Sequence, residues 1–481
     1  MNKIGFLKAE ITVLNKPHDM NKYCTALLIF FFLLFSHLGI AQSEVFKIGV
    51  ATRIINNEVG NYVQGAGTLR KATQIRDNLE ANAMYFSKGT FQLLMVSCDL
   101  VGLESSYVAR LREAMGVAAG IAPRNILISC THTHAGPSLL RTNYIMPVDT
   151  AYMERLQKWM VDLASEAVKT ARPGKIGWAK GEAQIGFNRR VTWADGTHTM
   201  HGDTKRKDFA GLEGPVDPQH LAMFASDIKG KLLAVLYNNT THPTIFYGAG
   251  IYSADFPGEV RKMIRNRISS NLTVLFLNGA QGDISIENML GNRPETVEDK
   301  LKRVSELVVG KTMELYKNVT YDDNPVLKHD YHDLKVALRS PSTEQLIEGR
   351  SVLARVDKGE NVGVMETILA YGAIRLQELY TNSPFEILPI HAVRIGELAI
   401  VTEPCELYCQ FGLDIKRRSP ASTTIVVGLT DGHGGYCPTI YGILGGGYSG
   451  APISWCRLEP YAGYKIVESA ARLLNRLWLD N

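Results

Sequence analysis

The amino-acid sequence predicts an α/β protein in which layered, mixed β-sheets are flanked by helices, with the active site at the carboxyl ends of strands. Short apolar runs rich in β-branched residues recur along the chain, and amphipathic helical patterns lie between them. This alternation is typical of layered α/β proteins. Several of the apolar runs lead into polar loops that contain glycine or proline, and ligands bind beyond such strand ends.

The N-terminal segment is expected to lie outside the fold. A basic start at 20–22 precedes an apolar run from Ala26 to Phe35, which is too short to span a bilayer, and small residues follow at 39–41. The pattern predicts a signal peptide over residues 1–41, cleaved after Ala41, and therefore an exported protein; an uncleaved anchor is the alternative. One domain over residues 42–481 is expected, since no linker or internal repeat divides it.

The expected elements follow in order along the chain. Continuous apolar runs predict strands, and apolar residues spaced every three or four positions predict helices. The strands cover residues 91–96, 126–130, 232–237, 273–277, 397–401 and 423–427. The helices cover residues 105–119, 150–171, 258–267, 296–316, 342–357 and 462–479.

Charge and cysteine content narrow the classes of partner and compartment. The chain has 52 lysines and arginines against 48 acidic residues, and no basic stripe indicates nucleic-acid binding. No obligate protein partner is implied. Cys98 and Cys130 end apolar runs and are expected to be buried thiols. In an exported protein, disulfides could join Cys405 with Cys409 or Cys437 with Cys456.

Two histidines at the end of an expected strand give the strongest chemical signal. Because side chains alternate along a strand, Cys130, His132 and His134 are expected on one face, and the Gly-Pro at 136–137 ends the strand. Two imidazoles at a strand tip suit one metal ligand beside a second ligand or a proton-transfer group, and zinc favours such nitrogen donors. A pair of hydrogen-bonded structural histidines is the alternative reading.

Two further candidates follow other expected strands. A zinc hydrolase needs several nitrogen or oxygen ligands and one position open to water. His242 follows the run at 232–237, and Glu406 follows the run at 397–401. The alternatives are a hydrogen-bonded loop histidine for His242 and, after Pro404, an ordinary helix-start glutamate for Glu406.

Taken together, these segments resemble the neutral/alkaline (non-lysosomal) ceramidases. The run His132-Thr133-His134-Ala135-Gly136-Pro137 resembles the family's HTHSGP motif. Later segments follow in the family's order: Asn188-Arg189, His242-Pro243, Gly282-Asp283-Ile284-Ser285, Pro404-Cys405-Glu406 and Gly446-Gly447-Tyr448-Ser449-Gly450-Ala451. The likeness covers roughly residues 46 to 475, the family's catalytic domain.

The resemblance implies a role for each matched residue. Zinc would be bound by His132, His242, Glu406 and Tyr448, with water completing the shell. His134 would transfer a proton at the scissile bond, and Arg189 would stabilise an oxyanion or hold the polar head of the substrate. Ser285 would be a nucleophile or a positioning hydroxyl.

The implied activity is that of an exported, zinc-dependent amidohydrolase cleaving the N-acyl amide bond of ceramide or a related N-acyl lipid. The expected partner is a small-molecule or lipid substrate, with a transient contact to a membrane surface at most. Ala135, Cys405, Ser449 and the pair at 286–287 depart from the family pattern, and its C-terminal immunoglobulin-like domain is expected to be absent. The alternatives are a zinc hydrolase of the same scaffold that acts on another amide, an ester or a glycan, and a non-catalytic binding protein.

Two remaining segments are assigned supporting roles. The glycine-rich stretch 428–436 lacks the spacing and lysine of a phosphate-binding loop, and it is interpreted as a rim loop whose Asp431, His433 and Tyr436 contact substrate. Asp255 lies in a turn ahead of a helix. We expect it to form part of an N-cap region, with orientation of His242 as the alternative.

Overall fold

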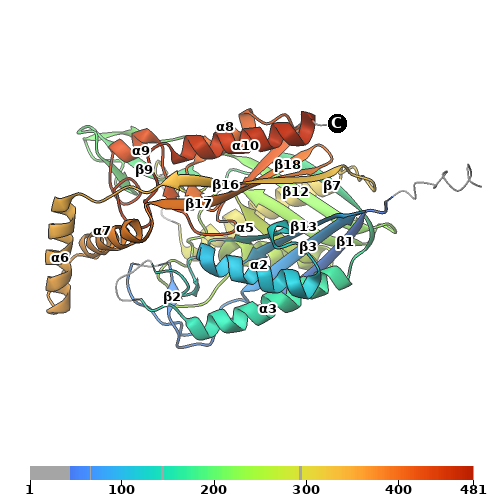
Figure 1. Cartoon of the computed structure of the whole chain (residues 1–481), viewed down its shortest axis with the longest axis horizontal. Coiled ribbons are helices and arrows are strands. Elements are labelled where there is room, and N and C mark those ends of the chain that lie inside the picture. The colour runs from blue at the N-terminus through green and yellow to red at the C-terminus, as the bar shows by residue number, and fades with distance from the viewer. Residues whose placement is uncertain (1–43, 66, 142–145, 292–294, 480–481) are drawn as a thin grey trace, which may run out of the picture. The chain divides into compact units, whose positions relative to one another are not determined.

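The computed structural model describes residues 44–65, 67–141, 146–291 and 295–479 (Figure 1). The signal peptide expected over residues 1–41 lies outside these ranges. Residues 46 onward form a single structural unit. Within the described ranges, every helix is too short or too polar to cross a membrane.

The larger sheet has eight strands in the order β14-β13-β12-β7-β1-β3-β4-β5. Their bounds are β1 Lys47–Ile54, β3 Glu80–Lys88, β4 Phe91–Cys98, β5 Ile126–Cys130, β7 Arg172–Glu182, β12 Gln219–Asp227, β13 Leu232–Asn239 and β14 Thr273–Asn278. Neighbouring strands are antiparallel except β4 with β5 and β13 with β14, which are parallel. The sheet is therefore mixed, as predicted.

This sheet curls, so that strands far apart in its order come into contact. The Ser97 hydroxyl on β4 donates to the carbonyl of Phe276 on β14 at 2.6 Å. Beyond the strand ends, His134 N in the loop after β5 donates to the Pro243 carbonyl in the loop after β13 at 3.2 Å. The curl thus brings the loops that follow β5 and β13 together, although these strands lie far apart in the order.

A second sheet packs face to face on the first. It contains β16 (Leu327–Ala337), β17 (Phe385–Ile395), β18 (Leu398–Thr402) and β20 (Thr423–Val427), in that order. Alternate side chains of both sheets, such as Met84, Phe86 and Val393, share one buried core.

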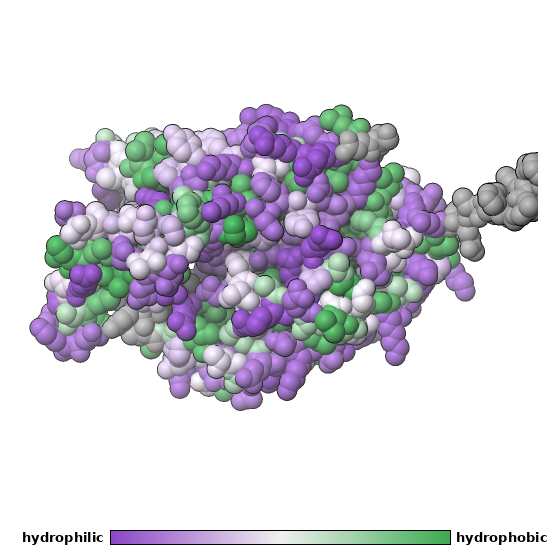
Figure 2. Space-filling model, in the orientation of Figure 1, coloured by the Kyte–Doolittle hydropathy of each residue, from purple (hydrophilic) through white to green (hydrophobic). Residues whose placement is uncertain are grey.

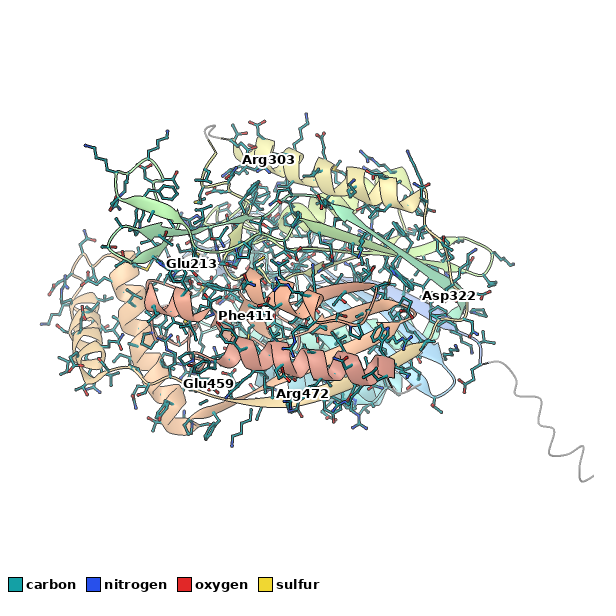
Figure 3. All side chains as sticks on the ribbon, turned by 90° about the horizontal axis from the view of Figure 1, so that it is seen from above. Glu213, Arg303, Asp322, Phe411, Glu459 and Arg472 are labelled. Atoms are coloured by element: carbon teal, nitrogen blue, oxygen red, sulfur yellow. The ribbon has the colours of Figure 1, made fainter. Side chains whose placement is uncertain are left out.

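Helices cover the outer faces of both sheets and complete four layers. The helices α2 (Ser105–Ala119), α3 (Thr150–Lys169), α4 (Asp255–Arg267) and α5 (Val297–Tyr316) pack on the larger sheet. On the smaller sheet lie α8 (Cys409–Arg417) and α10 (Ala462–Leu479), and Phe411 of α8 lies close to Gly463 of α10 (Figure 3). The helices α6 (Thr343–Asp357) and α7 (Val364–Asn382) form a hairpin at one end of Figure 1. The predicted fold class is confirmed.

Short elements connect these layers and carry much of the site. They are η1 (Pro123–Asn125), α9 (Ile440–Leu444), β2 (Val63–Gln64), β6 (Gly136–Pro137), β8 (Phe187–Asn188), β9 (Arg190–Trp193), β10 (His198–Met200), β11 (Phe209–Leu212), β15 (Ile284–Ser285), β19 (Cys405–Leu407) and β21 (Gly435–Cys437). The expected elements 105–119, 126–130, 423–427 and 462–479 match the structure residue for residue.

The cysteines correct one expectation. Cys98 and Cys130 are buried thiols as predicted, but Cys405, Cys409, Cys437 and Cys456 are also free and buried. The expected pairs do not face each other: the Cys405 thiol neighbours that of Cys437, and the Cys456 thiol donates to the Ser449 carbonyl at 3.1 Å.

His220 on β12 makes the folding stability pH-dependent. Its two ring nitrogens bond to Asn239 and Thr312, and burial lowers its pKa from 6.5 to about 4. Below pH 6.5 the unfolded chain protonates His220 but the folded protein does not. The contribution of His220 to the free energy of unfolding is therefore fully present above pH 6.5 and is lost as the pH falls toward 4. From about pH 7.5 to about pH 5 the loss is about 2 kcal/mol. In urea unfolding, the difference in free energy of unfolding between wild type and His220→Leu should therefore decrease by about 2 kcal/mol over this pH range. A difference that does not change with pH would contradict the lowered pKa of His220.

Candidate active site

Three histidines converge where the loops after β5 and β13 meet. His132 Nε2 lies 3.1 Å from His242 Nε2 and 3.2 Å from His134 Nε2. The imidazoles of His132 and His242 are almost fully buried. His132 has a positive φ of 70°, so it already lies beyond the regular strand. The structure thus brings together the three histidines predicted from sequence.

The backbone fixes the orientation of all three rings. Each Nδ1 lies within hydrogen-bond distance of a main-chain carbonyl: Val101 at 2.6 Å for His132, Gly65 at 2.9 Å for His134 and Gln281 at 2.9 Å for His242. A carbonyl only accepts, so each Nδ1 carries the proton and each Nε2 presents a lone pair. Burial lowers the pKa of His134 to about 3, with the nearby His132 adding to the effect, and burial also lowers the pKa of His242.

Asp255 does not orient His242. Its carboxylate accepts instead from the backbone N–H groups of Phe246 and Phe256, at 3.0 and 2.8 Å. The Gln281 carbonyl orients the ring. The segment is an N-cap region as expected: Ala254 is the N-cap residue of α4, without a side-chain cap, and Asp255 lies in the first turn.

Glu406 supplies a carboxylate to the same point. Its Oε2 lies 3.2 Å from His242 Nε2 and 3.4 Å from His132 Nε2. Burial opposes ionisation, but when the facing imidazoles are protonated, their charge and N–H donors, those of His132 above all, outweigh it and hold the pKa of the carboxyl well below its ordinary value. When the rings are neutral, three Nε2 lone pairs and one carboxylate face one another, and a divalent cation bound between them would remove the repulsion. Neutral imidazoles with a carboxylate form a donor set that suits zinc.

Two tyrosine side chains continue this cluster on the side of Glu406, one packed behind the other. In the β19–β21 ladder, Tyr436 is the direct partner of Glu406, and the two side chains are hydrogen-bonded. The Tyr448 hydroxyl bonds to Tyr436, and the two rings lie 5.5 Å apart. Tyr436 is thus next to the carboxylate, and Tyr448 lies one side chain further along.

Arg189 brings a positive charge to the site from the junction of β8 and β9. Its Nη2 donates to His242 Nε2 at 2.8 Å, to the Gly282 carbonyl at 3.0 Å and to the Tyr436 hydroxyl at 3.3 Å. The side chain is buried, its Nε has no hydrogen-bond partner, and no carboxylate among the described residues lies within ion-pair distance. Because a buried charge without a counter-ion is costly, this guanidinium is available to an anionic group.

Ser285 lies on the same wall as Arg189. It is in β15, which pairs with β8, and its hydroxyl accepts from the backbone N–H of Glu287 at 3.1 Å. The neighbouring Asp283 accepts from the Asn188 amide at 2.8 Å, and its carbonyl accepts from Arg189 N at 2.9 Å. These bonds hold the serine and the arginine in one rigid unit.

Most of these groups open onto one cavity of about 520 Å³, whereas His242 is fully buried behind its lining. His132, His134, Arg189, Ser285, Glu406, His433, Tyr436 and Tyr448 line its polar end. Sequence analysis missed His201, Tyr247 and the apolar wall from α7, namely Val364, Met365 and Ile368. His201 follows β10 with a φ of 63°, and only the fold reveals that it faces the cavity.

Two of the three candidates in the stretch 428–436 line the cavity. His433 lines the cavity with its Nε2 3.5 Å from Glu406 Oε1, and Tyr436 lines it as well. Asp431 does not line this cavity. Its carboxylate accepts from Ile128 N at 2.9 Å and faces His391 and Arg112 behind the site.

Comparison with solved structures identifies the fold. The chain superposes with a TM-score of 0.67 on the crystal structure of neutral ceramidase from Pseudomonas aeruginosa, at 16% sequence identity over 90% of this chain and 75% of that one. A structure described as ceramidase complexed with C2 matches with the same TM-score, at 17% identity over 90% of this chain and 76% of that one. The chain has a neutral ceramidase-like fold. No protein-family model matches the sequence, and no curated protein matches it closely enough to be counted.

The neutral ceramidase-like fold explains why dispersed segments meet. The match covers 90% of this chain. The sequence resemblance and the fold therefore agree on the same family of structures.

Proposed function

We propose that this protein is an exported, zinc-dependent amidohydrolase that cleaves the N-acyl amide bond of ceramide or a related N-acyl lipid. The observation that carries the proposal is the convergence of three histidine Nε2 atoms and the Glu406 carboxylate beside a cavity that has an apolar wall from α7. The similarity to neutral ceramidase structures supports it.

His132, His242 and Glu406 would hold the zinc ion, with Tyr436 or Tyr448 as the fourth ligand. Zinc, when bound, supplies a Lewis acid that activates water and polarises the amide carbonyl. Arg189 donates hydrogen bonds to the oxygen that gains negative charge, and Ser285 binds the reacting acyl group beside it. His134, whose Nε2 is unprotonated, would take a proton from the attacking water at that nitrogen and pass it to the departing nitrogen, so that amide and water become a carboxylic acid and an amine.

The cavity walls favour a substrate with a long apolar chain. Val364 and Met365 of α7 line the cavity and are also 48% and 50% exposed, and Ile347 on α6 is 62% exposed. Figure 2 shows apolar surface interspersed with polar residues at the end where the α6–α7 hairpin lies. An acyl chain entering along this wall would leave its amide at the polar end, and a transient contact of the hairpin with a membrane surface would supply such substrates.

Purified protein should be assayed against fluorescent ceramide and, in parallel, against N-acyl amino acids, simple esters and glycosides, each with and without a chelator. Ceramide cleavage that the chelator abolishes and zinc restores is the expected result. Zinc-dependent cleavage of another bond only would replace ceramide with that substrate class. A protein that binds no zinc and cleaves none of these would refute the proposal.

Paired tyrosine variants should identify the fourth ligand. We propose Tyr436 over Tyr448, because Tyr436 pairs with Glu406 in the β19–β21 ladder and bonds to both Glu406 and Arg189. Tyr436→Phe should weaken zinc binding by more than about 100-fold in a chelator competition, as expected for a lost ligand, whereas Tyr448→Phe, which removes only a hydrogen bond to that ligand, should weaken it by about 10- to 100-fold at most. The reverse order would assign Tyr448, as the family resemblance implies.

A further inference from the structure

The loop at 428–437 is attached to β5 behind the candidate zinc site. Cys130 N donates to the Leu429 carbonyl at 3.1 Å, and Asp431 N donates to the Ile128 carbonyl at 2.9 Å. The Asp431 carboxylate in turn accepts a hydrogen bond from Ile128 N at 2.9 Å. β5 leads to His132 and the loop leads to Tyr436, so this attachment joins the two halves of the site.

The loop's backbone conformation is not one that its residues favour locally. Leu429 and Asp431 have φ values of 51° and 61°, in the left-handed region that non-glycine residues adopt at a cost of about 1–2 kcal/mol. Contacts from the surrounding structure must therefore hold the loop in place. For Asp431 these contacts come from the second sheet and from α2.

On that side, the second oxygen of Asp431 faces two cationic or donor groups. His391 Nε2 of β17 lies 3.3 Å away and Arg112 Nη1 of α2 lies 3.5 Å away. His391 is buried, and its Nδ1 lies 2.9 Å from Nε2 of His329 on β16. With His329 donating to His391 Nδ1, the remaining proton of His391 is on Nε2; this nitrogen and Asp431 Oδ2 are both buried without a regular hydrogen bond, so the 3.3 Å contact between them is electrostatic.

His391 does not line the main cavity. It lines a separate one of about 240 Å³ together with Arg112, Arg124 and Tyr331. It therefore reaches the candidate zinc site only through Asp431 and the loop, and cannot contact a substrate bound there.

We propose that His391 is a positioning residue: through Asp431 it fixes the loop that carries His433 and Tyr436 against β5, and so sets the affinity of the site for zinc. The predicted effect of His391 on zinc affinity rests on the proposed function. Its predicted effect on the conformation of the loop does not, so the experiment can distinguish failure of the positioning role from failure of the proposed function.

The test compares His391→Leu, which removes the donor, with His391→Gln, which keeps an amide donor at similar reach. His220→Leu is the matched control, since His220 is equally buried and doubly hydrogen-bonded but lies elsewhere. Amide hydrogen exchange of residues 428–437 is measured in the metal-free proteins, and the zinc Kd is measured by chelator competition. Asp431→Asn provides a second route if His391→Leu does not fold.

His391→Leu and Asp431→Asn should speed exchange selectively in residues 428–437 and raise the zinc Kd about 10- to 100-fold. His391→Gln should restore most of both, and His220→Leu should change neither. The proposal is overturned if loop exchange is unchanged, if it rises equally in His220→Leu, or if His391→Gln gives no rescue. Should the wild type bind no zinc, the proposed function fails, and loop exchange alone decides the positioning role.

Discussion

Glu406→Gln is expected to release zinc and abolish hydrolysis. The change preserves the shape of the side chain but removes the negative charge between His132 and His242. The carboxylate is ionised in the metal-free protein, so the charge available to a cation is lost in full. Because loss of residues that merely support a ligand costs about 10- to 100-fold in metal affinity, loss of this ligand should exceed about 100-fold. Zinc per chain and the zinc Kd by competition measure it directly.

A neighbouring carboxyl offers a matched control for that experiment. Glu403 is fully buried and accepts from Cys405 N at 2.7 Å, and burial raises its pKa to about 8. It is largely uncharged near neutral pH, so Glu403→Gln removes little charge and should leave zinc binding unchanged. Equal zinc retention in both variants would mean that Glu406 is not a ligand.

Local sequence patterns were sufficient for the elements and for part of the site. The strand 126–130 is recognisable from its continuous run of apolar residues, and the helix 105–119 from apolar residues spaced three or four positions apart. The histidines at 132 and 134 follow from the same pattern. Strict alternation does not explain their convergence, however, because His132 has left the strand and has a positive φ.

The rest of the site depends on long-range geometry that no local pattern contains. Both Tyr436 and Tyr448 follow glycine-rich stretches, and only the register of β19 with β21 shows which of them faces Glu406. The curl of the larger sheet, which brings the loops after β5 and β13 together, is likewise absent from any single segment. The apolar wall from α7 reaches the cavity through packing of a distant hairpin.

The buried acidic residue of the rim loop illustrates the same limit. In sequence, Asp431, His433 and Tyr436 are equivalent polar residues in a glycine-rich stretch. In the fold, the positive φ of Asp431 turns its carboxylate toward Ile128, while His433 and Tyr436 face the cavity. A polar residue near a site can thus support the backbone of that site without touching its contents.

Arg189→Met should lower kcat by about 10²–10³-fold while zinc binding is retained. The guanidinium is buried at the cavity without a carboxylate partner, so its charge is available to an oxyanion, and methionine replaces its length without its donors. Because no carboxylate directly contacts the guanidinium, its loss should reduce the free energy of unfolding by less than the about 3–5 kcal/mol of a broken buried ion pair, and the remaining cost is that of its hydrogen bonds to His242, Gly282 and Tyr436.

The split between kcat and KM decides which of two roles Arg189 has. A loss confined to kcat indicates that the guanidinium binds the developing oxyanion, whereas a rise in KM alone indicates that it holds the polar head of the substrate in the ground state. Arg472→Met is the control, since Arg472 forms its ion pair with Glu468 on the exposed side of α10 and the variant should leave both constants unchanged. Activity within about threefold of wild type for Arg189→Met would remove the arginine from the reaction, because even one lost oxyanion donor costs about 100-fold.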